Sequence, residues 1–194
     1  MNKNLPKVEF QEFETLQEFA KVARENLDQN SWDYLFGAAE TETTCRRNRL
    51  ALDTMGFRPR VLRNVENVNV GTEFLGTKLN LPVVLAPIGS MQDFHEGAGA
   101  VPTQAAAEYG CLHMLSSVCA PGLEAVAAAA PDYPKIFQLY VRGDPDFVDD
   151  HAKRAIDNGY IAFAFTIDLD YYSRRERDLA KRYVTSGRRL AGYN

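Results

Sequence analysis

The sequence predicts an α/β fold in which a parallel β-sheet is covered by helices. Between residues 81 and 168, four short apolar runs typical of buried strands alternate with segments of helical pattern. The strand-like runs are apolar along nearly their whole length, not at every second residue. This pattern is typical of strands that are buried on both faces, as in parallel sheets with helical layers.

The residues before the predicted sheet are expected to be mostly helical. Residues 10 to 30 place apolar side chains at roughly helical spacing, and residues 43 to 53 form a second helical stretch that is rich in arginine. The segment from Phe57 to about Gly76 is punctuated by turn-forming residues, and we expect it to wrap against a larger body. The predicted organisation is an N-terminal part, residues 1–80, and a strand–helix part, residues 81–194, in one domain overall.

The strand–helix part follows a regular order. LPVVLAP is the first predicted strand, and the alanine-rich helix after it should end at Gly110 as a C-cap. LHMLSS and KIFQLYV are the second and third strands, separated by a helix within PGLEAVAAAA. A helix in DPDFVDDHAKRAIDNG, with Asp144 as N-cap and Gly159 as C-cap, leads to the fourth strand, IAFAFTID.

Length and composition indicate an ordinary globular protein, with 194 residues, 45% hydrophobic and 25% charged. A net charge of −4 gives no indication of nucleic-acid or anionic-membrane binding. Three cysteines without a CxxC pair argue against a disulfide framework and for a reducing compartment. Because no apolar run approaches the ~20 residues of a membrane span and no signal-peptide core is present, we expect a cytoplasmic protein.

Polar side chains follow the apolar body of each predicted strand. The strand ends read APIGS, LSSV, FQLY and FTID, and ligands of parallel α/β folds bind at such carboxyl ends. Because side chains alternate along a strand, Gln138 and Tyr140 should share one face, and Thr166 and Asp168 should pair in the same way. Burying one such group unpaired costs roughly 1–3 kcal/mol. Their convergence therefore favours a site for a polar ligand.

Several motifs, taken in order, resemble the N-terminal half of the FMN-dependent 2-hydroxy acid dehydrogenase/oxidase family, which includes glycolate oxidase, mandelate dehydrogenase and the flavin domain of flavocytochrome b2. The resemblance extends from about Trp32 to Tyr183. It depends on WDYLFGAAETE with RRNRLAL, FRPRVL, LPVVLAPIGS, MLSSV, FQLYV, and TID followed by RRERD. It implies the N-terminal half of a (β/α)8 TIM barrel, with four parallel strands, preceded by an N-terminal helical extension.

The resemblance also implies residue roles, with FMN lying across the strand ends. The backbone of Pro87, Ile88 and Gly89 would lie along the flavin ring. The side chains of Ser116, Gln138 and Thr166 would form hydrogen bonds to its polar edge. These six are the expected cofactor-binding residues. Tyr140 would touch the substrate hydroxyl, and Tyr34 and Arg175 would hold the substrate carboxylate. Asp168 would orient the catalytic histidine, so Asp168 and Tyr140 are the expected catalytic residues. No metal is expected, because no histidine or further acid lies near Asp168 and Asp170.

The chemistry of these residue types agrees with the implied roles. A guanidinium can form two parallel hydrogen bonds to a carboxylate, and a phenol beside it can add a third. A carboxylate paired with histidine stabilises the imidazolium that forms when the histidine removes a proton. Arg174 and Arg177 are expected instead on a solvated helix face with Glu176 and Asp178 as partners. The three histidines, His95, His113 and His151, are expected to be structural or exposed.

The histidine base, a second arginine, a flavin-stabilising lysine and the phosphate-binding loops of the family belong to its C-terminal half, so we expect a truncated or split member. Its four strands should leave two open sheet edges, and the chain should dimerise, bind a complementary C-terminal half, aggregate or be part of a longer product. The expected function is FMN-dependent oxidation of a small 2-hydroxy acid to a 2-keto acid. Two alternatives remain: a catalytically silent module that binds a partner chain through its sheet edges, and another phosphate-handling barrel such as an aldolase or isomerase.

Overall fold

The computed structural model describes residues 13–168 and 171–190. These residues form two compact units. The first, the helical unit, comprises the described residues up to Thr54 together with Ser173–Tyr183. The second, the sheet unit, comprises Met55–Tyr172 and the described residues from Val184 onward. The structure thus groups residues 55–80 with the sheet, and the domain boundary expected at residue 80 stays a prediction.

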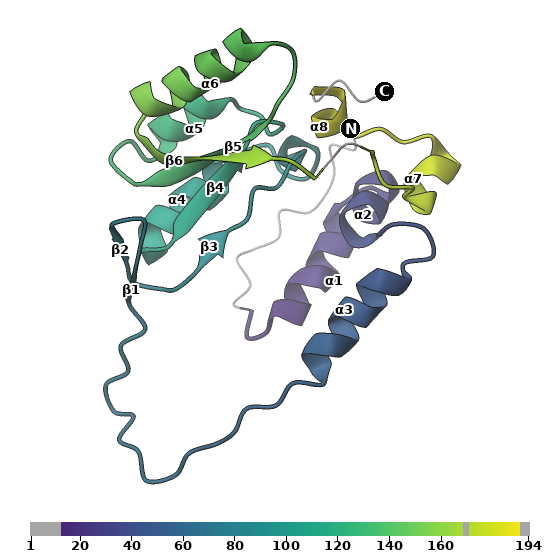
Figure 1. Ribbon diagram of the computed structural model, residues 1–194. Coiled ribbons are helices and arrows are strands. Elements are labelled where there is room, and N and C mark those ends of the chain that lie inside the picture. The colour runs from purple at the N-terminus through teal and green to yellow at the C-terminus, as the bar shows by residue number, and fades with distance from the viewer. Residues whose placement is uncertain (1–12, 169–170, 191–194) are drawn as a thin grey trace. The chain divides into compact units, whose positions relative to one another are not determined.

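Four parallel strands form the centre of the sheet unit, in the order β3-β4-β5-β6 (Figure 1). Their bounds are Val84–Leu85, Leu112–Ser116, Lys135–Tyr140 and Tyr160–Thr166. The predicted α/β class with four parallel strands is therefore confirmed. The first strand is much shorter than the apolar run that predicted it. It lies at an edge and is bracketed by Pro82 and Pro87, which have no backbone N–H to offer a ladder.

Helices α4 (Ala100–Tyr109), α5 (Leu123–Ala129) and α6 (Pro145–Asp157) connect the strands, and Figure 1 shows α5 and α6 beside β5 and β6. The main core joins β4 and β5 to these helices, through Leu115, Phe137, Leu139, Val126 and Ala155 among others. On β5 the neighbouring Ile136 belongs instead to a second core with Leu79 and Leu112. Side chains of β5 therefore alternate between two faces, as the sequence predicted.

Local signals explain where the helices begin and end. Gly110 ends α4 with φ of 70°, and a Cβ at this position would lie 2.3 Å from the side-chain nitrogen of Asn80, so only glycine fits. The Asp144 carboxylate accepts a hydrogen bond from the Phe147 N–H at 3.2 Å, which confirms the predicted N-cap of α6. The C-cap of α6 is Asn158, one residue earlier than expected, and Gly159 with φ of 75° turns the chain into β6.

A hairpin of β1 (Thr72–Phe74) and β2 (Thr77–Leu79) precedes the sheet, and its last residue, Leu79, is buried in the second core. The residues between α3 and the hairpin form neither helix nor strand. Their apolar side chains are exposed, which applies to Phe57, Val61, Leu62, Val65 and Val68. Within the described residues this segment is thus exposed, and its expected packing against a larger body stays a prediction.

The end of the sheet unit carries a short helix, α8 (Ser186–Leu190), that docks on the loop after β3. The Gly187 N–H donates to the Ser90 hydroxyl at 2.8 Å, and the Ser186 N–H donates to the Asp93 carboxylate at 2.8 Å. Asp93 ends a 3-10 helix, η1 (Met91–Asp93). These contacts fix the position of the loop that contains the predicted cofactor-binding residues 87–89.

The helical unit contains α1 (Leu16–Asn26), α2 (Gln29–Phe36), α3 (Thr43–Asp53) and α7 (Glu176–Lys181). The third helix has the bounds expected from the sequence. The helix expected over residues 10–30 is divided in two, and residues 10–12 lie outside the described part. The division occurs because Asp28 caps α2, where its carboxylate accepts from the N–H groups of Asn30 at 2.8 Å and Ser31 at 3.2 Å.

Candidate functional site

The register of the sheet brings four polar residues to its carboxyl edge. Ser116 on β4 lies opposite Gln138 on β5, and Tyr140 on β5 lies opposite Thr166 on β6. We call these four residues the strand-end cluster. The Gln138 side-chain amide donates to the Thr166 hydroxyl. The ends of β4, β5 and β6 therefore lie at one edge of the sheet, as the sequence predicted for these strands.

Gln138 has an unusual environment for an amide. Its side chain is 6% exposed, and its Oε1 is buried without a hydrogen-bond partner within the described residues. A buried, unpaired acceptor is costly, and so such an atom commonly marks a position where a ligand or water binds. The cluster thus has one acceptor available for a donor on a ligand.

Backbone contacts hold the neighbouring strands at this edge. The Ser117 N–H donates to the Gln138 carbonyl at 2.8 Å, and the Tyr140 N–H donates to the Ser117 hydroxyl at 3.1 Å. Sequence reasoning selected Ser116 and missed Ser117. The pair of serines in MLSSV was the available signal, since two hydroxyls at a strand end point to opposite faces.

The loop after β3 lets its backbone lie close to neighbouring groups. Gly89 faces Val118, and a Cβ at Gly89 would lie 2.8 Å from a Val118 methyl carbon. Ser90, which follows, has φ of 61° and is 1% exposed. Ile88 is 46% exposed and Pro87 is half-buried, so residues 87–89 offer a surface on which a flat ligand could lie.

Asp168 comes two residues after Thr166 and is exposed, and residues 169–170 after it lie outside the described part. The structure places Asp168 beyond the end of β6 rather than within it. The role expected for this carboxylate stays a prediction.

Tyr34 and Arg175 come together within the helical unit. The Arg175 guanidinium carbon lies 4.6 Å from the centroid of the Tyr34 ring. Its Nη2 donates to the carbonyl oxygens of Tyr34 and Gly37, the latter at 2.8 Å, and its Nε donates to Asp178 at 3.0 Å. We call Tyr34, Gly37, Arg175 and Asp178 the arginine cluster. To bind a ligand with two nitrogens at once, Arg175 would have to break one of the hydrogen bonds from Nη2 to these carbonyls.

The other arginines of this segment behave differently from one another. Arg174 is exposed, as expected. Arg177 was expected to pair with Glu176 and Asp178, and this is wrong. Its Nη2 donates to the Glu42 carboxylate at 2.8 Å, its Nε forms an ion pair with the same carboxylate at 2.6 Å, and its Nη1 lies 3.5 Å from Asp33. The reason is that Asp178 already pairs with Arg175. The hydrogen bond from Arg177 holds the pKa of Glu42 below its usual value.

The three histidines are either buried and hydrogen-bonded, half-buried on a helix or exposed, as expected. His113 is 2% exposed, and its Nδ1 lies 2.7 Å from the Thr103 hydroxyl. Burial lowers the pKa of His113 to about 4, so it is neutral at pH 7. His151 contacts the Phe147 carbonyl on α6, and His95 is exposed.

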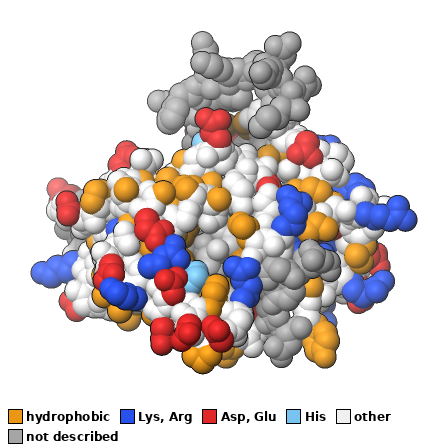
Figure 2. All heavy atoms as spheres, turned by 90° about the horizontal axis from the view of Figure 1, so that it is seen from above, with side chains coloured by type: hydrophobic (Ala, Val, Ile, Leu, Met, Phe, Trp, Pro, Cys, Tyr) orange, Lys and Arg blue, Asp and Glu red, His pale blue; other side chains and the backbone are white. Residues whose placement is uncertain are grey.

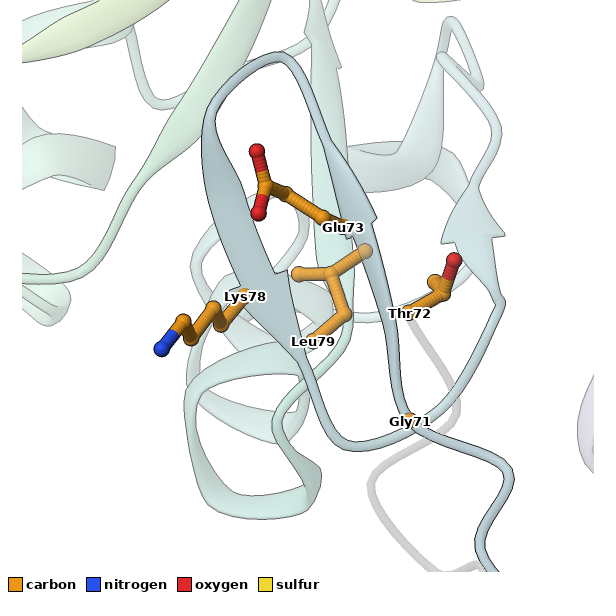
Figure 3. Close-up of a pocket in the computed structure, with 5 residues that line it drawn as sticks. All are labelled: Gly71, Thr72, Glu73, Lys78 and Leu79. Atoms are coloured by element: carbon orange, nitrogen blue, oxygen red, sulfur yellow. The ribbon is translucent and has the colours of Figure 1, made fainter.

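A hollow of about 300 Å³ lies at the β1–β2 hairpin and is lined by Gly71, Thr72, Glu73, Lys78 and Leu79. Figure 3 shows the Glu73 carboxylate and the Lys78 ammonium pointing in different directions, so no polar groups converge there. No group of three or more potential metal ligands occurs among residues 13–168 and 171–190. In the same residues, no helix is long and apolar enough to cross a membrane.

A parallel sheet with connecting helices and polar strand ends defines an α/β protein of the kind that binds small ligands at the carboxyl edge. Residues 23–192 match the family model described as FMN-dependent dehydrogenase, and the chain belongs to this family. The cofactor of the family is FMN.

The chain is 34% identical to glycolate oxidase 1 of Zea mays over 173 residues, which are 89% of this chain and 47% of the relative. It is 33% identical to glycolate oxidase of Spinacia oleracea with the same coverage. A solved structure of mandelate oxidase with (S)-2-phenylpropionate is similar with a TM-score of 0.84 and 29% identity, over 91% of this chain and 54% of that one. The chain spans about half the length of these relatives, which confirms the resemblance to half of a TIM-barrel oxidase.

Proposed function

We propose that this chain provides the flavin-ring side of an FMN-dependent oxidoreductase that converts a small 2-hydroxy acid to a 2-keto acid. The observation that carries the proposal is the buried, unpaired Oε1 of Gln138 beside Thr166 at the carboxyl edge of the sheet. Family membership supports it. The glycolate and mandelate oxidases among the relatives support a 2-hydroxy acid as the substrate class.

The donors and acceptors of the strand-end cluster fit the polar edge of a flavin ring, where an imide N–H lies between two carbonyl groups. Gln138 Oε1 can accept from the N–H, and Thr166, which accepts from Gln138, retains its own O–H as a donor. Ser116 offers a further hydroxyl, and residues 87–89 offer backbone along the ring. Bound FMN would take up the two electrons that the hydroxy acid loses.

The proposed substrate contacts are two tyrosines and an arginine. Tyr34 and Arg175 would bind the carboxylate of the acid, and Tyr140 would contact its hydroxyl. Asp168 would orient the histidine that acts as the base. We also propose a cytoplasmic location, since the three cysteines are free and two of them are buried, which suits a reducing compartment.

FMN titration tests the cofactor assignment. We expect the protein to quench flavin fluorescence on binding, and Gln138→Leu to weaken binding at least tenfold, because the acceptor is removed without loss of volume. Gln104→Leu on α4 is a matched control, since Gln104 is exposed and distant in sequence from the strand ends. Anaerobic addition of glycolate, L-lactate or mandelate should bleach the flavin when a C-terminal half of a glycolate oxidase is supplied. A protein that binds no FMN, alone or with that half, would contradict the proposal.

A catalytically silent interaction module remains a second candidate, and the open edge at β6 favours it. Ile156, Ile161 and Phe165 expose 73%, 42% and 53% of their surface along α6 and β6. Figure 2 shows hydrophobic side chains among the charged ones on the face in view. Light scattering separates the two functions: a stable, flavin-free dimer favours the module, whereas FMN binding that requires a C-terminal half favours the split enzyme.

A further inference from the structure

Arg175 is held at a fixed place by the first turn of α7. Arg175 is the N-cap residue of this helix, and its carbonyl accepts from the Asp178 N–H at 3.1 Å. The Asp178 carboxylate in turn accepts a hydrogen bond from the Arg175 Nε at 3.0 Å. Backbone and side chain thus join the same two residues, so the guanidinium cannot move without disturbing the start of the helix.

The charge of Asp178 makes this pairing obligatory. Asp178 is 6% exposed, and its Oδ1 is buried without a partner within the described residues. A buried carboxylate that loses its cation is left uncompensated, which is strongly unfavourable. Arg175 therefore stays at Asp178 when a ligand binds elsewhere on the guanidinium.

The hydrogen bonds of Arg175 show which guanidinium nitrogen remains able to bind a ligand. Nε donates its single hydrogen to Asp178, and the two hydrogens of Nη2 go to the carbonyls of Tyr34 and Gly37. Within the described residues, Nη1 forms neither a hydrogen bond nor an ion pair. The free end of the guanidinium is thus one nitrogen with two hydrogens, above the Tyr34 ring.

We propose that Asp178 is a positioning residue, which holds Arg175 so that Nη1 alone is presented to the carboxylate of the substrate. This inference rests on the proposed function, in which Arg175 binds the acid. The substrate carboxylate therefore binds only Nη1 and does not form the two parallel hydrogen bonds that the sequence suggested. The reason is that Nε and Nη2 already donate to groups of the protein.

Docking of α7 does not by itself require this pair. Arg177 and Lys181 on the same helix already contact Asp33 of α2, and Arg177 also contacts Glu42. A second set of contacts, Arg175 with Asp178 and the two carbonyls, is therefore more than the packing of the helix needs.

Arginine-selective modification with phenylglyoxal, mapped by tandem mass spectrometry, tests the positioning. We expect Asp178→Asn to raise the modification rate of Arg175 at least fivefold and to leave that of Arg174 unchanged. Asp178→Glu, which keeps the charge, should keep the slow rate, and Glu176→Gln is a control on the same helix turn. An unchanged Arg175 rate in a folded Asp178→Asn variant would overturn the inference.

A measurement on the unaltered protein tests the same inference if the Asp178→Asn variant does not fold. The Nε–H of Arg175 should exchange with solvent at least tenfold more slowly than that of Arg174 in ¹⁵N-resolved NMR spectra. Equal exchange rates would show that Asp178 does not hold the guanidinium.

Ligand binding to the FMN-loaded protein, completed with a C-terminal half, tests the consequence for the substrate. Asp178→Asn should weaken binding of mandelate about tenfold and leave binding of mandelamide unchanged, because only the acid uses the Nη1 contact. Equal losses for acid and amide would mean that Asp178 is merely structural. If the unaltered protein binds neither ligand, the proposed function fails, while the modification and exchange rates still decide the positioning.

Discussion

The arginine cluster and the strand-end cluster contain most of the residues proposed to bind ligands, and they are built from different forces. In the arginine cluster, a cation is held by a carboxylate, two carbonyls and an aromatic ring. In the strand-end cluster, neutral amide and hydroxyl groups are fixed by strand pairing above a close-packed core. The helical unit therefore depends mainly on charge, and the sheet unit depends mainly on apolar burial.

This difference has a physical consequence. Ion pairs near the surface are weakened by salt, because mobile ions screen them over a distance of about 10 Å at 0.1 M. Apolar packing does not have this sensitivity, and its loss leaves a cavity that the surroundings fill only in part. The two clusters should thus respond differently to substitution, salt and pH.

The largest effect is expected from the core below the strand-end cluster. Phe137 is 2% exposed and packs against Tyr160, Phe163 and the helices, so Phe137→Ala should lower the free energy of unfolding by about 4 kcal/mol. Urea denaturation followed by circular dichroism measures this. Adding 1 M NaCl should not reduce the difference from the unaltered protein, and a difference that vanishes in salt would break the comparison.

A pH effect of about 3 kcal/mol is expected from His113, also in the sheet unit. Burial lowers its pKa from 6.5 to about 4, so the unfolded chain binds the proton more tightly than the folded one. The contribution of His113 is fully present above pH 6.5 and is lost as the pH falls towards 4. Urea midpoints between pH 4.5 and 7.5 should show this loss, and it should be smaller in His113→Gln. Identical pH profiles would show that His113 is not responsible.

A smaller effect, about 1 kcal/mol, is expected from Asp33 in the helical unit. Asp33 accepts from Lys181 and lies 3.5 Å from Arg177, and its pKa is below the usual value because of hydrogen bonds from Gln29, Lys181 and Arg177. Asp33→Asn should destabilise the protein at 20 mM NaCl and have little effect at 1 M. An effect that is the same at both salt concentrations would mean that the contacts of Asp33 are not mainly electrostatic.

The smallest effect is expected from Arg174→Ala, below about 0.5 kcal/mol, because the side chain is exposed. Arg175→Ala provides the comparison, since it leaves the buried Asp178 without its cation and should be markedly more destabilising. Thermal melts of the two variants, run in parallel, test the distinction. Equal shifts would mean that the arginine cluster contributes no more than a solvated side chain.

Much of the sheet unit could be predicted from the sequence. The strands β4, β5 and β6 were predicted because each is a short apolar run, which is a local feature of the sequence. That Gln138 and Phe137 point to opposite faces follows from strand geometry alone. The length of β3 was overestimated, because LPVVLAP reads as a strand whereas two prolines and an edge position limit its pairing. The break between α1 and α2 at Asp28 was missed, because the helical spacing of apolar residues continues across it.

The sequence by itself determined the alternation of strands and helices from β3 to β6, the family and the residue types at the strand ends, since these depend on local pattern and on motifs. Only the tertiary structure decided the partners of each side chain. Arg177 binds Glu42, and Arg175 binds the carbonyls of Tyr34 and Gly37. Each of these three contacts joins residues more than a hundred positions apart. Charged side chains are long and have many acceptors within reach, so their pairing depends on which helices meet, and local sequence does not encode this.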